Sequence, residues 1–262
     1  MNTLRIEDGM FKMASCWGEL SFSDLLFLGR EFPLRDTADF HAKVLLHFVD
    51  LKNNAWLKDI LSGERIYDIL TMGGKGSLFG WLFDEPVMEK CLVRSFKVEQ
   101  FPFAKVLQGP TDMLYNLTLG EFRYAESCLN EYLSSKKRID LATFLAVIYR
   151  PKAKNENGDD REAFSVLKVD VLAEVILKSI SIEHMHALML QYIAMRGYVI
   201  NAHKDAFESG GTAKSQNATW GGLINQLAQN ITDIPEIENK LLWRALEWLV
   251  HKKQNRVTEP VN

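Results

Sequence analysis

The segment from Leu117 to Pro151 constrains the fold most, because it carries the local signals of a complete helical hairpin. Thr118 and Glu121 match the capping-box pattern T-x-x-E, which predicts that a helix begins at about Leu119. Apolar residues then recur at the three-and-four spacing of one helical face: Phe122, Ala125, Leu129, Tyr132 and Leu133. A polar run ends this helix, and a second apolar face continues until the proline stops it.

Helical patterns recur elsewhere in the chain. Ser21 and Asp24 form a second capping box and predict a helix that runs to Pro33. An apolar stripe that begins at Ile182 predicts another helix, closed by Gly197. Glycines, aromatic residues and β-branched residues instead cluster between about residues 72 and 110. We therefore expect a mainly α, irregular multi-helix protein of helical hairpins with a small β or extended insertion.

Breakers along the chain suggest a division into subdomains. Gly109 and Pro110 precede the hairpin, so residues 109–116 are the candidate boundary. This predicts an N-terminal helical subdomain over 1–110, which holds the β or extended segment at about 72–110, and a C-terminal helical subdomain over 111–252. Residues 253–262 are expected to form a flexible tail. The polar stretch 152–161 is typical of a solvated loop.

Composition excludes several classes of protein. The net charge of -3 argues against a nucleic-acid-binding surface as the main activity. Three widely spaced cysteines suit reduced thiols in the cytoplasm better than a disulfide framework. The N-terminal residues do not show the pattern of an export signal. The sequence also contains no run of about 20 apolar residues, the length that a helix needs to span a bilayer. We therefore expect a cytoplasmic protein that binds neither nucleic acid nor membrane.

Sequence motifs for chemistry are missing. Residues 73–77 read Gly-Gly-Lys-Gly-Ser, but the glycine and the hydroxyl residue that a phosphate-binding loop requires are not at the right spacing. His184 and His186 are two apart, whereas helical zinc ligands are usually four apart. We expect no catalytic residue, no cofactor-binding residue and no metal ligand, although an enzyme with a dispersed site stays open.

Aromatic residues, 11% of the chain, provide the candidate anchors. Most should lie in the core, and some could instead contact a protein partner. The candidates for a structural or interaction role are Trp220, Gly221, Gly222, Phe122, Tyr149 and Trp248. Trp220 follows a long polar loop and starts an apolar stripe, so we predict that it is a buried anchor for the helix over 219–229.

Four stretches resemble one protein family. The sequences are NLTLGEF at 116–122, DLATFLAVIYRP at 140–151, ATWGGLINQLAQ at 218–229 and LLWRALEWLVHKK at 241–253. In the same order, these resemble segments of tail-assembly-chaperone-like proteins of Bacteroidetes phages and prophages. The resemblance covers about a third of the chain.

The resemblance implies a non-enzymatic protein that binds tail components, such as the tape measure or tail tube proteins, while a virion is assembled. It implies a location in the cytoplasm of the host cell, and it carries over no catalytic residue. One alternative is a structural component of the virion or of a contractile particle. The second alternative is the enzyme with a dispersed, motif-free site.

Overall fold

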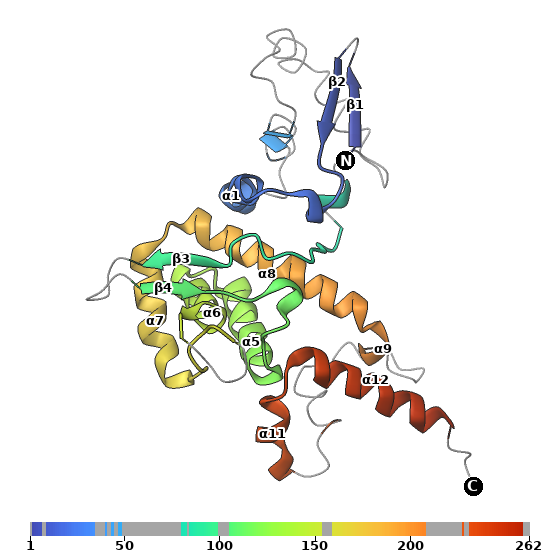
Figure 1. Cartoon of the computed structure of the whole chain (residues 1–262). Helices are drawn as coiled ribbons and strands as arrows, with labels where there is room; N and C mark the ends of the chain where they lie inside the picture. The colour runs from blue at the N-terminus through green and yellow to red at the C-terminus, as the bar shows by residue number, and fades with distance from the viewer. Residues whose placement is uncertain are drawn as a thin grey trace. The chain divides into compact units, whose positions relative to one another are not determined.

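The structure is a computed structural model that describes residues 2–6, 9–34, 40, 43–44, 47–48, 80–82, 84–98, 105–153, 159–207, 227 and 231–258. Helices predominate, together with a two-stranded hairpin and a three-stranded antiparallel sheet (Figure 1). This confirms the mainly α class with a small β insertion. The chain forms two compact units, Met1–Leu92 with Ser181–Gly197 (unit 1) and Val93–Ile180 with Tyr198–Asn262 (unit 2).

Unit 1 begins with a β-hairpin that the sequence analysis did not foresee. Its described elements are β1 (Asn2–Ile6), antiparallel β2 (Gly9–Met13), η1 (Trp17–Glu19), α1 (Phe22–Glu31), η2 (Phe32–Leu34), η4 (Gly80–Leu82) and residues 182–197 of α8 (Ile182–Ala202). The capping box of α1 is formed as expected: Asp24 N donates to Ser21 Oγ at 3.3 Å, and Ser21 N donates to Asp24 Oδ2 at 2.8 Å. Leu25 and Leu28 of this helix lie in the buried core of the unit.

Helix α8 does not end at Gly197, so that prediction is wrong: the helix continues to Ala202. A Cβ at this position would collide with the carbonyl oxygen of Pro86. Nearby, Met88 N donates to the carbonyl oxygen of Ala194 at 2.9 Å. The glycine therefore permits the backbone around residues 86–88 to approach the helix closely, and it does not act as a helix stop.

Unit 2 combines the sheet with the predicted hairpin. Its described elements are β3 (Ser95–Val98), β4 (Lys105–Gln108), η5 (Asp112–Leu114), α5 (Leu119–Ser135), α6 (Arg138–Ile148), β5 (Arg150–Pro151), α7 (Val166–Ser179), residues 198–202 of α8, α9 (Lys204–Phe207), η6 (Ile231–Asp233), α11 (Ile234–Glu238) and α12 (Leu242–Thr258). The sheet is antiparallel in the order β3-β4-β5. Figure 1 shows α5, α6 and α7 beside β3 and β4.

The α5–α6 hairpin matches the prediction closely. Glu121 N donates to Thr118 Oγ1 at 3.2 Å, Thr118 N donates to Glu121 Oε2 at 3.4 Å, and α5 begins at Leu119. The helix ends at Ser135, and its C-cap residue, Lys136, adopts left-handed backbone angles with φ of 56°. Helix α6 buries all of its residues from 144 to 148. Because it is apolar on nearly every side, α6 is the central helix of this unit and packs against both α5 and α7.

Two boundaries and one loop differ from the expected ones. The units divide between residues 92 and 93 and not at 109–116, and β4 pairs with β5, which lies beyond the expected boundary. Helix α12 continues to Thr258, so the helix does not stop at residue 252. The stretch 152–161 is not a wholly solvated loop either, because an antiparallel bridge joins Lys152 to Arg161 at its ends.

Candidate functional site

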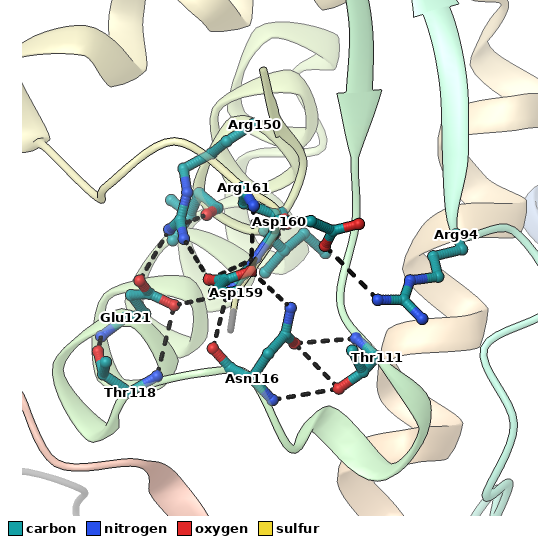
Figure 2. Close-up of polar contacts among 11 residues, drawn as sticks. Arg94, Thr111, Asn116, Thr118, Glu121, Arg150, Asp159, Asp160 and Arg161 are labelled. Carbon is teal, nitrogen blue, oxygen red and sulfur yellow. Dashed lines mark hydrogen bonds and ion pairs between the residues drawn. The ribbon is translucent and has the colours of Figure 1, made fainter. Parts of the chain in front are cut away.

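The most unusual side chain in unit 2 is Arg161, at the end of the stretch expected to be solvated. It is 0% exposed, although arginine is among the residues that are least often fully buried. The bridge between Lys152 and Arg161 and the hydrogen bond from Ala153 N to Asp160 O, 2.9 Å, place Asp160 and Arg161 beside Lys152 and Ala153. A buried guanidinium requires paired charges and filled hydrogen bonds, and Figure 2 shows how they are supplied.

Every nitrogen of the Arg161 guanidinium has an acceptor. Nε donates to Asp159 Oδ1 at 3.0 Å, and Nη1 donates to the carbonyl oxygen of Ile148 at 3.2 Å. Nη2 donates to Asp159 Oδ2 at 2.9 Å, to Glu121 Oε2 at 3.2 Å and to the carbonyl oxygen of Asn116 at 2.7 Å. These contacts join the turn before α5, the first turn of α5 and the end of α6.

Arg150 is the second buried guanidinium, and its side chain is 5% exposed. Its Nη1 pairs with Glu121 Oε1 at 2.9 Å, and its Nη2 lies 3.6 Å from Asp159 Oδ2. Burial lowers the pKa of Arg150, and the nearby charge of Arg161 lowers it further. The guanidinium carbon lies 5.7 Å from the centre of the Phe164 ring. Its Nε has no hydrogen-bond partner among the described residues.

Asp159 is the carboxylate shared by both arginines. Burial alone would raise its pKa, but the hydrogen bonds and the charge of Arg161 outweigh this, so the pKa lies below its ordinary value. Asn116 contributes by donating from Nδ2 to Asp159 Oδ1 at 3.1 Å. The orientation of the Asn116 amide is set in turn by Thr111 N, which donates to its Oδ1 at 2.8 Å.

We call Asn116, Glu121, Arg150, Asp159 and Arg161 the buried arginine network. Its two guanidinium groups and two carboxylates balance in charge, and each carboxylate is held by both arginines. Such an arrangement fixes the side chains of the network in place. The network therefore holds the segments of unit 2 that meet around it in fixed positions.

Two cavities lie beside Arg150 and Phe164. The larger, of about 1000 Å³, is lined by the first turn of α5, by the α11–α12 turn and by residues 159–166. Across it, Arg123 Nη2 pairs with Glu238 Oε1 at 2.6 Å. The smaller, of about 270 Å³, lies at the start of α7, and we call it the α7 groove. Its lining residues are Lys105, Ala146, Arg150, Pro151, Glu162, Ala163, Phe164, Ser165, Leu167, Lys168, Val169, Val171 and Leu172.

Unit 1 has a cavity of its own, of about 340 Å³, with His47 in its wall. His47 Nε2 lies 2.8 Å from Asp24 Oδ1, and its ring stacks on Phe27 with the centroids 3.9 Å apart. Burial tends to raise the pKa of Asp24, but the hydrogen bonds from His47 and Ser21 bring it below its ordinary value. Among the described residues, no group of three or more His, Cys, Asp or Glu side chains could hold a metal ion.

Comparisons with protein-family models, with curated proteins and with solved structures found no match to this chain. Of the helices in the described part of the chain, none is both long enough and apolar enough to cross a membrane. The function must therefore be argued from the surfaces and cavities of the two units.

The structure separates the predicted anchors into different environments. Phe122 and Tyr149 are both 0% exposed, and Tyr149 Oη donates to the carbonyl oxygen of Val93 at 2.7 Å. Trp248 is 40% exposed, with the Nζ of Lys240 5.0 Å and that of Lys252 5.9 Å from its ring. Residues 220–222 lie outside the described part of the chain, so the burial of Trp220 stays a prediction.

Sequence reasoning missed Asp159, Arg161 and the exposed apolar residues of α7. The two charged residues sit in a polar run, where neighbouring residues give no sign that they are buried. One signal was present: Arg150 stands between Pro151 and the mostly apolar helix α6, which ends at Ile148. A charge at that position must be paired when the helix is buried on all sides.

Proposed function

We propose that this chain is a non-enzymatic protein that binds tail components during the assembly of a phage or prophage tail. The resemblance described above supports this role. Its residues Asn116, Glu121 and Arg150 belong to the buried arginine network, and Phe122 and Tyr149 belong to the core. Some of the residues that carry the resemblance thus also hold unit 2 together, and kinship would preserve such residues even where partners differ.

The observation that carries a binding role is the exposed apolar surface at the start of α7. Leu167 is 92% exposed, Val171 is 62% exposed and Val166 is 51% exposed. The buried side of the same helix already packs on α6 through Val169 and Leu172. Apolar side chains on both sides of a helix indicate that the outer side is covered in a complex.

The partners proposed are the tape measure or tail tube proteins, met in the cytoplasm of the host cell. A chaperone-like protein would leave before the particle is complete. A structural component of the virion, the alternative role, would stay. Both roles use the same exposed surface of α7, so only the fate of the protein distinguishes them.

The experiment is to tag the protein in a host that carries its gene, induce particle production and purify the protein after crosslinking. A chaperone-like role predicts tail proteins among the crosslinked partners and no copies of this protein in purified particles. Stoichiometric presence in particles would instead establish the structural role. If no tail protein is crosslinked under conditions that yield particles, the proposal is wrong.

A matched pair of variants tests whether α7 carries the binding. Leu167→Asp places a charge on the exposed apolar surface, whereas Lys178→Glu changes charge at the other end of the same helix. We expect the first to abolish crosslinking to tail proteins and the second to leave it intact. Both positions are exposed, and losing the pair of Lys178 with Glu174 should cost less than about 1 kcal/mol, so both variants should fold.

A further inference from the structure

The larger cavity beside the buried arginine network has the size of a binding site, and we call it the α5 cavity. Its volume of about 1000 Å³ matches the larger pockets that bind ligands in proteins. Its described wall comes from the turn before α5, the first turns of α5, Arg150, residues 159–166 and residues 238–244, all within unit 2. A cavity of this size admits a short peptide segment and excludes a folded domain.

Most charges in the wall of the α5 cavity are already paired within the protein. Of its three carboxylates, two belong to the buried arginine network, and the third, that of Glu238, pairs with Arg123 at 2.6 Å. Lys240 pairs with Glu236 at 3.1 Å. Arg244 is the one cation of the described wall without a carboxylate partner. A ligand therefore meets one available positive charge and no available carboxylate in this wall.

Arg150 contributes a second unused donor to the wall. Its side chain is 5% exposed, and its Nη1 and Nη2 lie beside the carboxylates of Glu121 and Asp159. Its buried Nε–H, however, has no acceptor in the described part of the chain. A buried donor without an acceptor is costly, and such a group indicates that a bound molecule supplies the acceptor. The wall therefore favours a ligand that brings acceptor oxygens.

Aromatic side chains form much of the apolar wall. Tyr124 lies against Phe164 with the ring centroids 5.6 Å apart. Tyr115 is 47% exposed, and its ring centroid lies 4.6 Å from that of Trp243. Such rings pack favourably against the face or edge of another aromatic ring. A ligand that complements the wall therefore carries an aromatic side chain together with its acceptor oxygens.

Val166 connects the α5 cavity to the exposed apolar surface of α7. It lines the cavity and is 51% exposed, and it directly precedes Leu167, which is 92% exposed. A protein that covers the exposed side of α7 thus lies beside the cavity. A segment of that same protein is therefore the ligand that is closest at hand.

We propose that the α5 cavity binds the C-terminal segment of the protein that covers α7. The terminal carboxylate pairs with Arg244, and a main-chain carbonyl accepts the hydrogen bond from Arg150 Nε. An aromatic side chain of the segment packs against Tyr115, Tyr124 and Phe164. A chain end supplies both kinds of oxygen, a carboxylate and carbonyls. This inference rests on the proposed protein-binding function and specifies which part of the partner is recognised.

The test uses the full-length protein and three short peptides that carry a fluorescent label at the N-terminus. Two have the sequence Gly-Ala-Gly-Phe and end in a free carboxylate or in an amide, and the third, Gly-Ala-Gly-Ala, ends in a free carboxylate. Fluorescence anisotropy should show the first binding about tenfold more tightly than either of the others. Equal affinities for the carboxylate and the amide, or no binding of any peptide, would overturn the inference.

A matched pair of variants locates the carboxylate. Arg244→Gln removes the available charge and should abolish the preference for the free carboxylate over the amide. Lys178→Gln, the control, removes an exposed cation of the same unit that does not line the cavity. It should bind all three peptides as the wild type does. Hydrogen exchange of α5 and α12 should match the wild type in both variants, and a retained preference in Arg244→Gln would overturn the inference.

The Nε–H of Arg150 provides an independent measurement. Nuclear magnetic resonance of isotope-labelled arginine follows this group, and the Nε–H of Arg161, which already donates to Asp159 at 3.0 Å, is the internal reference. Addition of the phenylalanine peptide with a free carboxylate should shift the Arg150 signal and slow its exchange with water. The Arg161 signal should change less. An unchanged Arg150 signal with peptide bound would overturn the inference.

The outcome is separable from that of the proposed function. Crosslinking to tail proteins that survives while no peptide binds would refute the α5 cavity as the site and leave the function standing. Peptide binding with the expected preference, but without any tail-protein partner, would support the cavity and refute the role in tail assembly.

Discussion

The capping boxes of α1 and α5 are the same local motif in two different settings. In α1, Asp24 caps the helix and its other oxygen meets His47, with side-chain exposures of 23% and 27%. In α5, Glu121 caps the helix while it pairs with both buried arginines, and its side chain is 7% exposed. The comparison teaches that a capping residue contributes locally to its helix, whereas its tertiary partners decide how much of the fold depends on it.

The largest expected effect comes from removing a member of the buried arginine network. Arg161→Ala leaves Asp159 and Glu121 without one of their guanidinium partners, so we expect unit 2 to lose about 3 to 5 kcal/mol of unfolding free energy. Arg94→Ala is the control, because Arg94 is half exposed and its contact with Asp160 is 3.5 Å long. That change should cost less than about 1 kcal/mol in urea denaturation. If both variants lost similar amounts of unfolding free energy, the network would not contribute more to the stability of unit 2 than an exposed ion pair does.

The next largest effect is a difference in stability cost between replacing Glu121 and replacing Asp24, the two acidic capping residues. Glu121→Ala removes a cap and leaves Arg150 and Arg161 underpaired, which we expect to cost about 3 kcal/mol. Asp24→Ala removes a cap and a partly exposed contact with His47, for a cost of about 1 kcal/mol. Native-state hydrogen exchange of α5 and of α1 measures each loss within its own unit. Equal destabilisation of the two helices would show that the tertiary partners of Glu121 add nothing to its effect as a cap.

Acid should weaken unit 2 through Asp159. Because its pKa is lower when folded than when unfolded, the unfolded chain binds the proton more readily. The stability from this carboxylate is complete above the unfolded pKa of about 3.9 and is lost as the pH falls through the lower folded value. Asp159→Asn should therefore reduce stability at neutral pH and flatten its fall below about pH 4. Asp160→Asn changes the neighbouring residue, in the exposed pair with Arg94, and is the control that leaves Asp159 and its arginine contacts in place.

The smallest effects are expected from removing the N-cap hydroxyls. Their loss should cost α1 and α5 a similar amount of stability. Ser21→Ala and Thr118→Ala each remove one side-chain acceptor for a backbone N–H, at a cost of about 1 kcal/mol apiece. Thr118→Ser keeps the acceptor and should restore the amide protection of the first turn of α5. Hydrogen exchange of these turns is the measurement, and a much larger loss at Thr118 than at Ser21 would mean that this cap, too, is coupled to the network.

The sequence predictions were confirmed for features that depend on residues close together in the chain. Both capping boxes, the start of α5 at Leu119 and the strands within 72–110 were readable, because each depends on residues a few positions apart. The prediction that Gly197 ends a helix failed because it also rested on a local rule. Glycine often ends a helix, but here its missing side chain allows the carbonyl group of Pro86 to approach closely. A local rule cannot tell which use a glycine has.

The α7 groove was beyond sequence reasoning for a different reason. Val166, Leu167 and Val171 look like ordinary helix-packing residues, and only the position of α6 shows that they face away from the core. Likewise, Asp159 and Arg161 stand in a polar run that composition assigns to solvent. Their burial depends on pairing with segments far away in the chain, which single-sequence patterns do not report.

By itself, the sequence determined the helical class, the two capped helix starts and the hairpin, because hydrogen bonding and apolar spacing over a few residues set these features. The tertiary structure alone decided that Glu121, Arg150, Asp159 and Arg161 meet, and that Leu167 stays outside. The physical reason is that burial is a property of the whole packed unit: charges leave water only when partners from distant segments arrive together.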